Sequence, residues 1–215
     1  MKKYILIAGV NGAGKSTLYQ TTVSFKGMKR INLDETVRSF GDWKNRSDVM
    51  KAGKIVVEEI KEAFNMGITF NQETTLCGNA ILRNIEKAKK LGYEIELHYV
   101  GVESVEIAKE RIAYRVANGG HGIPDEDVER RYVESFINLI NVIKECSLVV
   151  LYDNTEIFNR FAIYMDGSLI TVSDETPLWY KKIEAVLESE QEIANGAEAA
   201  RAEKVFEELE KKHFG

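Results

Sequence analysis

The sequence predicts an α/β fold with a mostly parallel sheet flanked by helices, an antiparallel hairpin at the end of the sheet and a C-terminal helical tail. Short apolar runs alternate with helical patterns along most of the chain, which is the order of βαβ units. Asp166-Gly167 separates two later apolar runs, as expected of a hairpin turn. The stretch from about Glu188 to Lys212 is rich in Glu, Ala and Lys and weakly amphipathic, which indicates an appended helix.

Composition and charge exclude several classes of protein. Of the 215 residues, 44% are hydrophobic, and 29 basic against 34 acidic residues give a net charge of −5. Such a chain can bury a core, but it has no overall positive field to attract nucleic acid. No apolar run approaches the roughly 20 residues that span a bilayer, and Met1-Lys2-Lys3 leads into the first strand without a cleavage site. We expect a cytoplasmic protein with neither nucleic acid nor membrane as a partner.

A phosphate-binding loop follows the first strand, which we predict over Tyr4–Ala8. The next eight residues fit the Walker A pattern G-x-x-x-x-G-K-[ST], and we expect these and the following threonine to contact a nucleotide: Gly9, Val10, Asn11, Gly12, Ala13, Gly14, Lys15, Ser16 and Thr17. The glycines let successive N–H groups point into one concavity, and the following helix adds its positive end. We expect ATP here, with Lys15 on the terminal phosphates, Thr17 on the innermost phosphate and Ser16 on Mg²⁺.

Carboxylates follow the second strand, which we predict over about Met28–Leu33, after a helix from Ser16 to about Phe25. In an open parallel sheet, ligands bind outside the carboxyl ends of the strands, so Asp34 emerges at the same edge as the phosphate loop. Asp is also a favoured N-cap, here for a helix over Glu35–Phe40. The catalytic and capping roles are compatible.

Polar residues also follow the third strand, predicted over Ile68–Phe70 after a long amphipathic helix from Ser47 to Met66. The polar segment is Asn71-Gln72-Glu73-Thr74-Thr75. It is either a binding surface or a polar loop that caps the next helix, Asn79–Leu91, and the sequence favours neither.

Arginines flank a glycine-rich loop after the fourth strand, Ile95–Val102. Arg111 and Arg115 lie one turn apart on a helix over about 105–118, so they project from one face. The segment 118–124 contains three glycines and His121, and the next helix carries Arg130 and Arg131. This arrangement predicts either a lid over about 105–132 or a solvated hairpin whose arginines pair with nearby carboxylates. His121 is then either a phosphate contact or a turn residue exposed to water.

A fifth strand over Leu148–Asp153 ends in an Asp, as the metal-binding Walker B segment does. We assign no metal to Asp153, because it begins a turn and because Ser16, phosphates and water can hold magnesium. The hairpin follows over 161–172, and Thr176-Pro177 begins another helix.

Four motifs, in this order, resemble the zeta toxin family of P-loop kinases, and in particular its small bacterial members. They are Gly9–Thr17, Ile31-Asn32-Leu33-Asp34-Glu35, Glu73-Thr74-Thr75-Leu76, and Gly119–Pro124 followed by Arg130-Arg131-Tyr132. The resemblance extends from about Lys3 to Asn154 and does not include the tail. It implies a P-loop NTPase-type fold and transfer of the γ-phosphoryl group of ATP to a hydroxyl of UDP-N-acetylglucosamine, with Mg²⁺.

The resemblance also implies roles for individual residues. Asp34 matches the catalytic base, Glu73 matches an acidic contact to the sugar nucleotide, and Thr75 matches a neighbouring hydroxyl contact. The expected catalytic set, in which the lid arginines match phosphate clamps, is Lys15, Asp34, Arg111, Arg115 and Arg131. The expected substrate contacts are Glu73, Thr74, Thr75 and His121.

Two departures from the toxins bear on the acceptor more than on the reaction. Cys77 stands where the toxins place an arginine, and His121 lies near the expected position of a second arginine. The acceptor is then a nucleotide sugar or another small hydroxyl compound, such as an antibiotic or a nucleoside. A further alternative is an ATP-binding regulatory module without transfer activity.

We divide the chain into a P-loop kinase-like domain over residues 1–175 and a helical extension over residues 176–215. An antitoxin-like protein partner, or self-association through the C-terminal helix, is compatible with this division.

Overall fold

The computed structural model describes residues 1–194, and this part of the chain forms one seven-stranded sheet in the order β2-β3-β1-β4-β5-β6-β7. The strands are β1 Lys3–Ala8, β2 Lys29–Ile31, β3 Phe70–Thr74, β4 Glu94–Gly101, β5 Leu148–Asp153, β6 Asn159–Met165 and β7 Ser168–Val172. Neighbours among the first five strands pair in parallel, whereas β6 and β7 pair antiparallel. The predicted parallel sheet with a terminal hairpin is confirmed.

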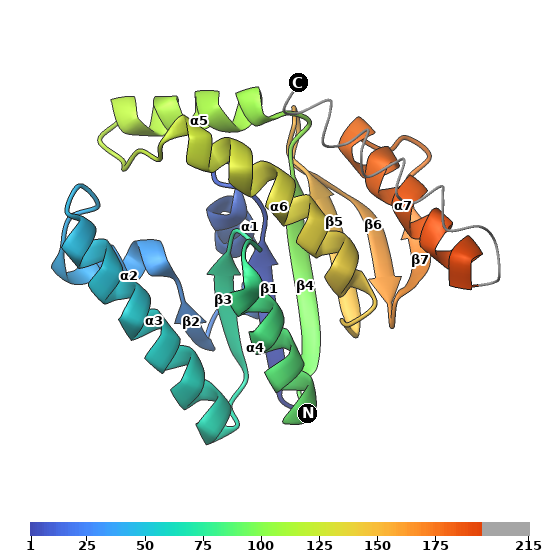
Figure 1. Ribbon diagram of the computed structural model, residues 1–215, viewed down its shortest axis with the longest axis horizontal. Helices are drawn as coiled ribbons and strands as arrows, with labels where there is room; N and C mark the ends of the chain where they lie inside the picture. Colours follow the sequence, from blue (N-terminus) through green and yellow to red (C-terminus); the bar gives the residue numbers. More distant parts are fainter. Residues whose placement is uncertain (195–215) are drawn as a thin grey trace.

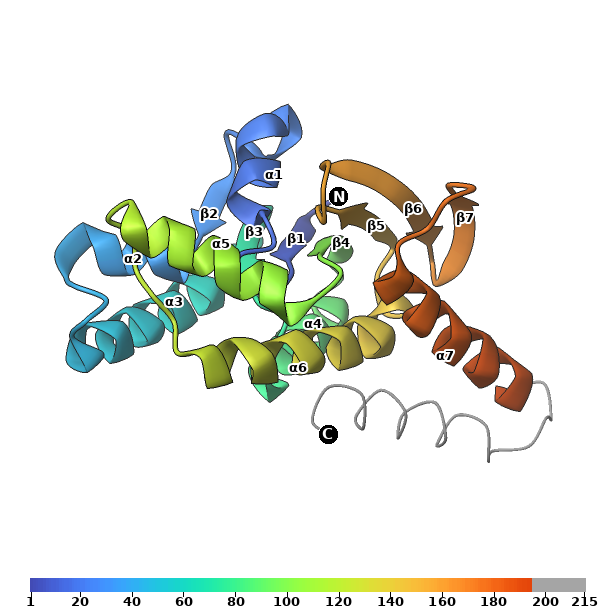
Figure 2. The ribbon, with the colours of Figure 1, turned by 90° about the horizontal axis from the view of Figure 1, so that it is seen from above.

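Helices cover both faces of the sheet. They are α1 Lys15–Thr21, α2 Leu33–Phe40, α3 Arg46–Met66, α4 Asn79–Lys90, α5 Val105–Ala117, α6 Asp125–Ile143 and α7 Leu178–Ala194. Seen from above, α1 lies on one side of the sheet, and α4, α6 and α7 lie on the other (Figure 2). Helix α5 crosses the end of the sheet toward which the parallel strands run (Figure 1). The site is expected at this end.

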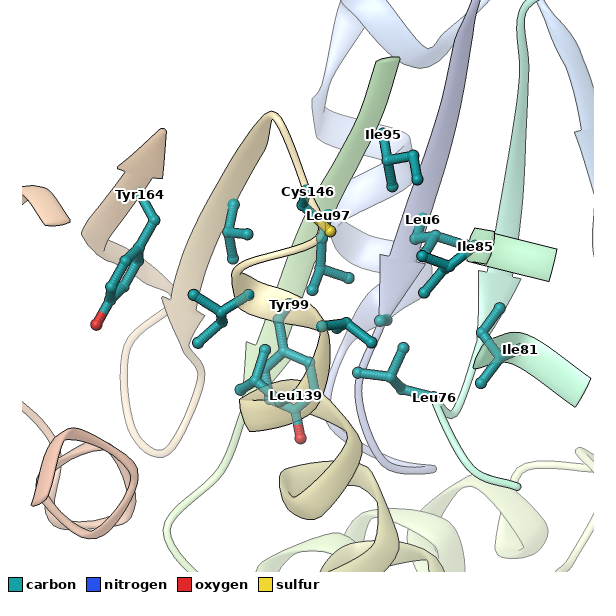
Figure 3. Close-up of a cluster of buried hydrophobic side chains, with 14 of the residues drawn as sticks. Leu6, Leu76, Ile81, Ile85, Ile95, Leu97, Tyr99, Leu139, Cys146 and Tyr164 are labelled. Atoms are coloured by element: carbon teal, nitrogen blue, oxygen red, sulfur yellow. The ribbon is translucent and has the colours of Figure 1, made fainter. Parts of the chain in front are cut away.

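The alternation of side chains along β1 divides the core into two layers. Tyr4 and Leu6 pack in the larger cluster with α3, α4, α6 and α7, and Ile5 and Ile7 pack in a second cluster with α1 and α5. Figure 3 shows part of the larger cluster, in which Leu97 and Tyr99 of β4 face Ile85 of α4 and Leu139 of α6.

Several element boundaries differ from the prediction. Helix α1 ends at Thr21, and a 3₁₀ turn over Val23–Phe25 follows it. Strand β3 begins at Phe70 and includes Asn71–Thr74, which the sequence placed after the strand as either a binding surface or a polar loop. The reason is that β3 lies between β1 and β2, so its backbone pairs on both sides whatever its side chains are.

Helix α7 packs on the core of the sheet through its first three turns. Trp179, Tyr180, Ile183 and Val186 are buried and belong to the same cluster as β4 and β6. The part of the predicted tail beyond Ala194 lies outside the described residues. No helix within residues 1–194 combines the length and the apolar character needed to cross a bilayer.

We predict that His98 makes stability depend on pH. Its ring is buried on β4 against Phe25, with Nδ1 3.3 Å from the Tyr152 hydroxyl. Burial lowers the pKa of His98 from 6.5 to about 4, although Glu96 opposes the shift. Between these two pH values the unfolded chain binds the proton more tightly, so stability falls as the pH falls from 6.5 to 4. The loss attributable to His98 is about 3 kcal/mol.

The measurement is urea unfolding of the wild-type protein and of His98→Gln from pH 4 to 7.5. We expect the difference in the free energy of unfolding between the two proteins to change across this range. A constant difference would contradict the assignment.

Candidate active site

The phosphate loop is held close to its neighbours by glycines. Gly9, Gly12 and Gly14 have φ of +135°, +82° and +106°, a range that side chains disfavour. A Cβ atom would lie 2.2 Å from the carbonyl oxygen of Val100 at Gly9 and 2.6 Å from that of Ala108 at Gly12. Helix α1 begins at Lys15, within this segment, and its N-cap Gly14 provides no side-chain cap. The glycine cradle and the uncapped helix end therefore fit a polyphosphate.

Lys15 lies at the base of this loop. Its Nζ donates to the carbonyl oxygens of Gly9 at 2.9 Å and Val10 at 3.0 Å, and the residue is only 8% exposed. Burial lowers the pKa of Lys15, and the charges of Glu73 and Asp34 oppose this shift. Lys15, Glu73 and Asp34 thus share one electrostatic environment.

Two polar residues from later parts of the chain hold the phosphate loop. Asn154, in the turn after β5, donates from Nδ2 to the carbonyl oxygen of Ala13 at 2.8 Å. Arg131 of α6 donates from Nη1 to Asn11 Oδ1 at 3.0 Å. No sequence pattern pointed to Asn154, which looked like an ordinary turn residue. The lid therefore contacts the loop through Arg131.

Glu73 joins the ends of three strands. It lies near the end of β3, beside β1 in the sheet, and its side chain is 9% exposed. Arg30 of β2 donates to its Oε2 at 2.8 Å, Asn32 donates to the same oxygen at 2.9 Å, and Ser16 Oγ lies 3.4 Å from Oε1. Burial raises the pKa of the Glu73 carboxyl, and Lys15 and Arg30 oppose this shift.

The remaining contacts of Arg30 fix its position. Its guanidinium lies 3.4 Å from the centre of the Tyr19 ring, and Nε lies 3.1 Å from Glu35 Oε1. Sequence reasoning missed Arg30 because a single arginine on a short strand carries no pattern. Its role becomes visible only when β3 is placed beside β2.

Asn32 caps α2, whereas the sequence suggested that Asp34 has this role. The Asn32 side chain accepts hydrogen bonds from the backbone N–H groups of Asp34 at 2.8 Å and Glu35 at 3.3 Å. Because β2 ends at Ile31, the extended residue that precedes the helix is Asn32. Asp34 lies in the first turn with its carboxylate free of capping, and 32% of its side chain is exposed.

Ser16 and Glu73 are the residues that could hold a magnesium ion. A Walker A serine hydroxyl and a carboxylate at the end of the neighbouring strand are oxygen ligands of the kind Mg²⁺ binds, directly or through water. Among the described residues no three His, Cys, Asp or Glu side chains cluster as a metal site.

The two threonines after Glu73 form a turn and leave α4 uncapped. The Thr74 hydroxyl accepts from the backbone N–H of Leu76 at 3.0 Å, and Cys77 Sγ lies 3.3 Å from the carbonyl oxygens of Thr75 and Arg131. The N-cap of α4 is Gly78, so the alternative in which a threonine of the polar segment caps this helix is wrong. Thr74 and Thr75 precede this N-cap by four and three residues, so they do not occupy the capping position.

The lid arginines occupy different places. Arg115 donates from Nε to the carbonyl oxygen of His121 at 3.1 Å, and Arg111 donates to the carbonyl oxygen of Thr155 at 3.0 Å. Arg115 Nη2 and Arg111 Nη1 are buried without a hydrogen-bond partner among the described residues. Burial lowers the pKa of Arg115, and the charges of Asp34 and Glu73 oppose the shift.

Arg130 behaves as the solvated-hairpin interpretation predicted. It is exposed and pairs along its own helix with Asp127 at 2.7 Å and Glu134 at 3.0 Å. Arg131, the next residue, points to the phosphate loop. A step of one residue, about 100° around the helix, thus separates a surface arginine from one in the site.

His121 is buried, although a water-exposed turn was one of the two expectations. Its side chain is 8% exposed, its ring stacks on Trp43, and Nε2 lies 3.4 Å from Asp34 Oδ2. Trp43 lies between α2 and α3, and no sequence pattern connected it to the glycine loop.

Asp153 has a structural role. Its Oδ1 accepts from Trp179 Nε1 at 2.8 Å and from the Thr155 hydroxyl at 2.8 Å. These bonds connect the turn after β5 to α7.

A family model described as an AAA domain (AAA_33) matches residues 5–137, more than half of the chain. The chain belongs to this AAA domain family. The matched part of the AAA domain extends from β1 into α6 and contains the phosphate loop, Asp34, Glu73 and the lid arginines. An uncharacterized protein of Haemophilus influenzae is 34% identical to this chain over 130 residues. These residues cover 60% of this chain and 92% of that protein.

Two solved structures resemble the AAA domain in fold. The AvrRxo1-ORF1:-ORF2 complex with ATP has a TM-score of 0.64 at 16% identity, covering 98% of this chain and 76% of that chain. The PezAT chromosomal toxin–antitoxin system of Streptococcus pneumoniae has a TM-score of 0.55 at 19% identity. The match covers 97% of this chain and 87% of that chain. The AAA domain therefore has a P-loop NTPase fold.

We predict that Arg30 stabilises the fold because it compensates the buried charge of Glu73. Their side chains are 11% and 9% exposed, so Arg30→Ala leaves a carboxylate in a dry site. We expect the free energy of unfolding at pH 7.5 to fall by about 3 kcal/mol. The matched control, Glu35→Ala, removes the exposed partner of Arg30 and should cost less than about 1 kcal/mol.

Adding Glu73→Gln to Arg30→Ala should restore part of the loss, because the unpaired charge is gone. Urea unfolding of the wild-type protein, Arg30→Ala, Glu73→Gln and the double variant measures this coupling. Additive losses would show that the ion pair does not hold the strand ends.

Proposed function

We propose that this protein is an ATP-dependent small-molecule kinase of the zeta toxin type. The observation that carries the proposal is that Asp34 lies beside His121, whose carbonyl Arg115 holds, while Arg131 of the same segment contacts the phosphate loop that carries Lys15. A base, a phosphate-binding lysine and a lid arginine are the parts that phosphoryl transfer to a hydroxyl requires. The ATP in the AvrRxo1 complex supports the choice of nucleotide.

Each residue has a distinct proposed role. The loop N–H groups and Lys15 hold the phosphates, and Asn154 and Arg131 keep the loop in shape. Ser16 and Glu73 hold Mg²⁺, which when bound neutralises charge on the phosphates. This is a different role for Glu73 from the expected sugar contact, because its carboxylate is turned toward Ser16, Arg30 and Asn32.

Asp34 acts as the base in the transfer. The acceptor oxygen bonds to the γ-phosphorus as the bond from that phosphorus to the bridging oxygen breaks. ADP leaves with the electron pair, and the hydroxyl proton passes to the Asp34 carboxylate. Arg115, through its unpartnered Nη2, stabilises the charge that spreads over the transferred group.

A nucleotide sugar such as UDP-N-acetylglucosamine is the acceptor we propose. The support is the order of the four zeta-toxin-like motifs, and the fold shared with the PezAT toxin–antitoxin system agrees with it. Thr74, Thr75 and His121 remain proposed acceptor contacts. By the same likeness, we propose an antitoxin-like protein partner.

The transfer reaction can be tested by mass spectrometry. UDP-N-acetylglucosamine incubated with the protein and Mg-ATP should gain one phosphoryl group, and Asp34→Asn should bind ATP with unchanged affinity but form no product. A product from Asp34→Asn at the wild-type rate would contradict the role of Asp34. Tight ATP binding without transfer to any hydroxyl compound would favour a regulatory module.

We predict that the lid arginines differ in their effect on kcat. Arg115→Ala should lower kcat about 10³-fold, because a clamping arginine acts in the transition state. Arg111→Ala should lower it less, since Arg111 bonds Thr155. The matched control is Arg130→Ala, an exposed arginine on the lid, which should leave kcat unchanged. Equal small losses for all three variants would contradict a clamp.

A further inference from the structure

The position of His121 is fixed by the end of α5, despite the glycines around it. Arg115 Nε donates to the His121 carbonyl oxygen at 3.1 Å, and the Gly120 N–H donates to the Arg115 carbonyl oxygen at 2.9 Å. A Cβ at Gly120 would lie 2.5 Å from the Arg115 side chain, so the backbone needs glycine there. The loop thus presents His121 to the site in one direction.

Trp43 provides the surface on which the imidazole lies. The two rings are stacked, with their centres 4.1 Å apart and their planes at 12°. Trp43 belongs to the turn between α2 and α3, so this contact joins the lid loop to the helix that carries Asp34. Stacking fixes the plane of the imidazole and therefore the direction of its Nε2.

The edge of the imidazole faces the proposed base. His121 Nε2 is buried and lies 3.4 Å from Asp34 Oδ2, slightly beyond a good hydrogen bond. Catalytic hydrogen bonds are often long before the substrate binds and shorten in the productive complex. No other hydrogen-bond partner for Nε2 occurs among the described residues.

The charges around His121 favour the neutral ring. Burial lowers the pKa of His121, and Arg115 of α5 and Arg38 of α2 lower it further, whereas Asp34 opposes the shift. A neutral imidazole can carry its proton on Nε2 and donate it to a carboxylate oxygen.

We propose that His121 is a positioning residue for Asp34. Held flat by Trp43, it donates from Nε2 to Oδ2 when the lid closes and turns Oδ1 of the carboxylate toward the acceptor hydroxyl. This inference rests on the proposed function, because it assigns Asp34 as the base. The lid would then position the base as well as clamp the phosphates.

Two substitutions at one position separate positioning from packing. The amide nitrogen of His121→Gln can reach the place of Nε2, whereas that of His121→Asn corresponds to Nδ1 and falls short. We expect ATP affinity to stay within about twofold in both variants. Transfer by His121→Asn should fall about 10- to 100-fold in kcat, as for a misplaced group, and His121→Gln should recover most of it. Equal losses in both variants, or none, would overturn the proposal.

The contact itself can be tested without an acceptor. NMR titration should give His121 a pKa below 6.5 in the wild-type protein, with its signal assigned by its absence from His121→Asn. Asp34→Asn should lower this pKa further, because the carboxylate that opposes the shift is gone. An unchanged pKa would overturn the contact. An intact contact with no transfer to any acceptor would instead overturn the proposed function, and the positioning role with it.

Discussion

The site depends on the hydrogen bonds and the ion pair that surround the buried carboxylate of Glu73. This carboxylate lies between the ends of β1, β2 and β3, and Ser16, Arg30 and Asn32 each approach one of its oxygens. A charge in this place is tolerated only with such partners. The network therefore fixes the distance between the phosphate loop and the start of α2, where Asp34 lies.

The lid completes this arrangement from the other side. Arg131 contacts the phosphate loop, Arg115 holds the His121 carbonyl oxygen, and the loop between them places His121 against Trp43. The lid thus contacts both the part of the protein that would hold ATP and the part that would activate an acceptor. In the proposed reaction, one movement of this lid would bring both to the geometry that phosphoryl transfer needs.

Periodicity and the glycine motif were enough to predict most of the fold. The sheet, its terminal hairpin and the phosphate loop are all encoded in local sequence patterns. The same is true of the end of α3, where Gly67 is the C-cap. The residues that sequence reasoning missed act across long separations. Arg30 meets Glu73 after 43 residues, and Asn154 meets Ala13 after 141. Trp43 and His121 carry no shared pattern, because their stacking exists only once the lid folds onto α2.

A crystal structure with Mg²⁺ and a non-hydrolysable ATP analogue is the most direct test of the account. We expect Lys15 to leave the carbonyl oxygens of Gly9 and Val10 for the phosphates, and the ion to lie on Ser16 with Glu73 in its shell of ligands and water. Asp34 should face the terminal phosphate across a gap that admits a hydroxyl group. A nucleotide bound away from the loop, or an Asp34 carboxylate turned away from its terminal phosphate, would contradict the account.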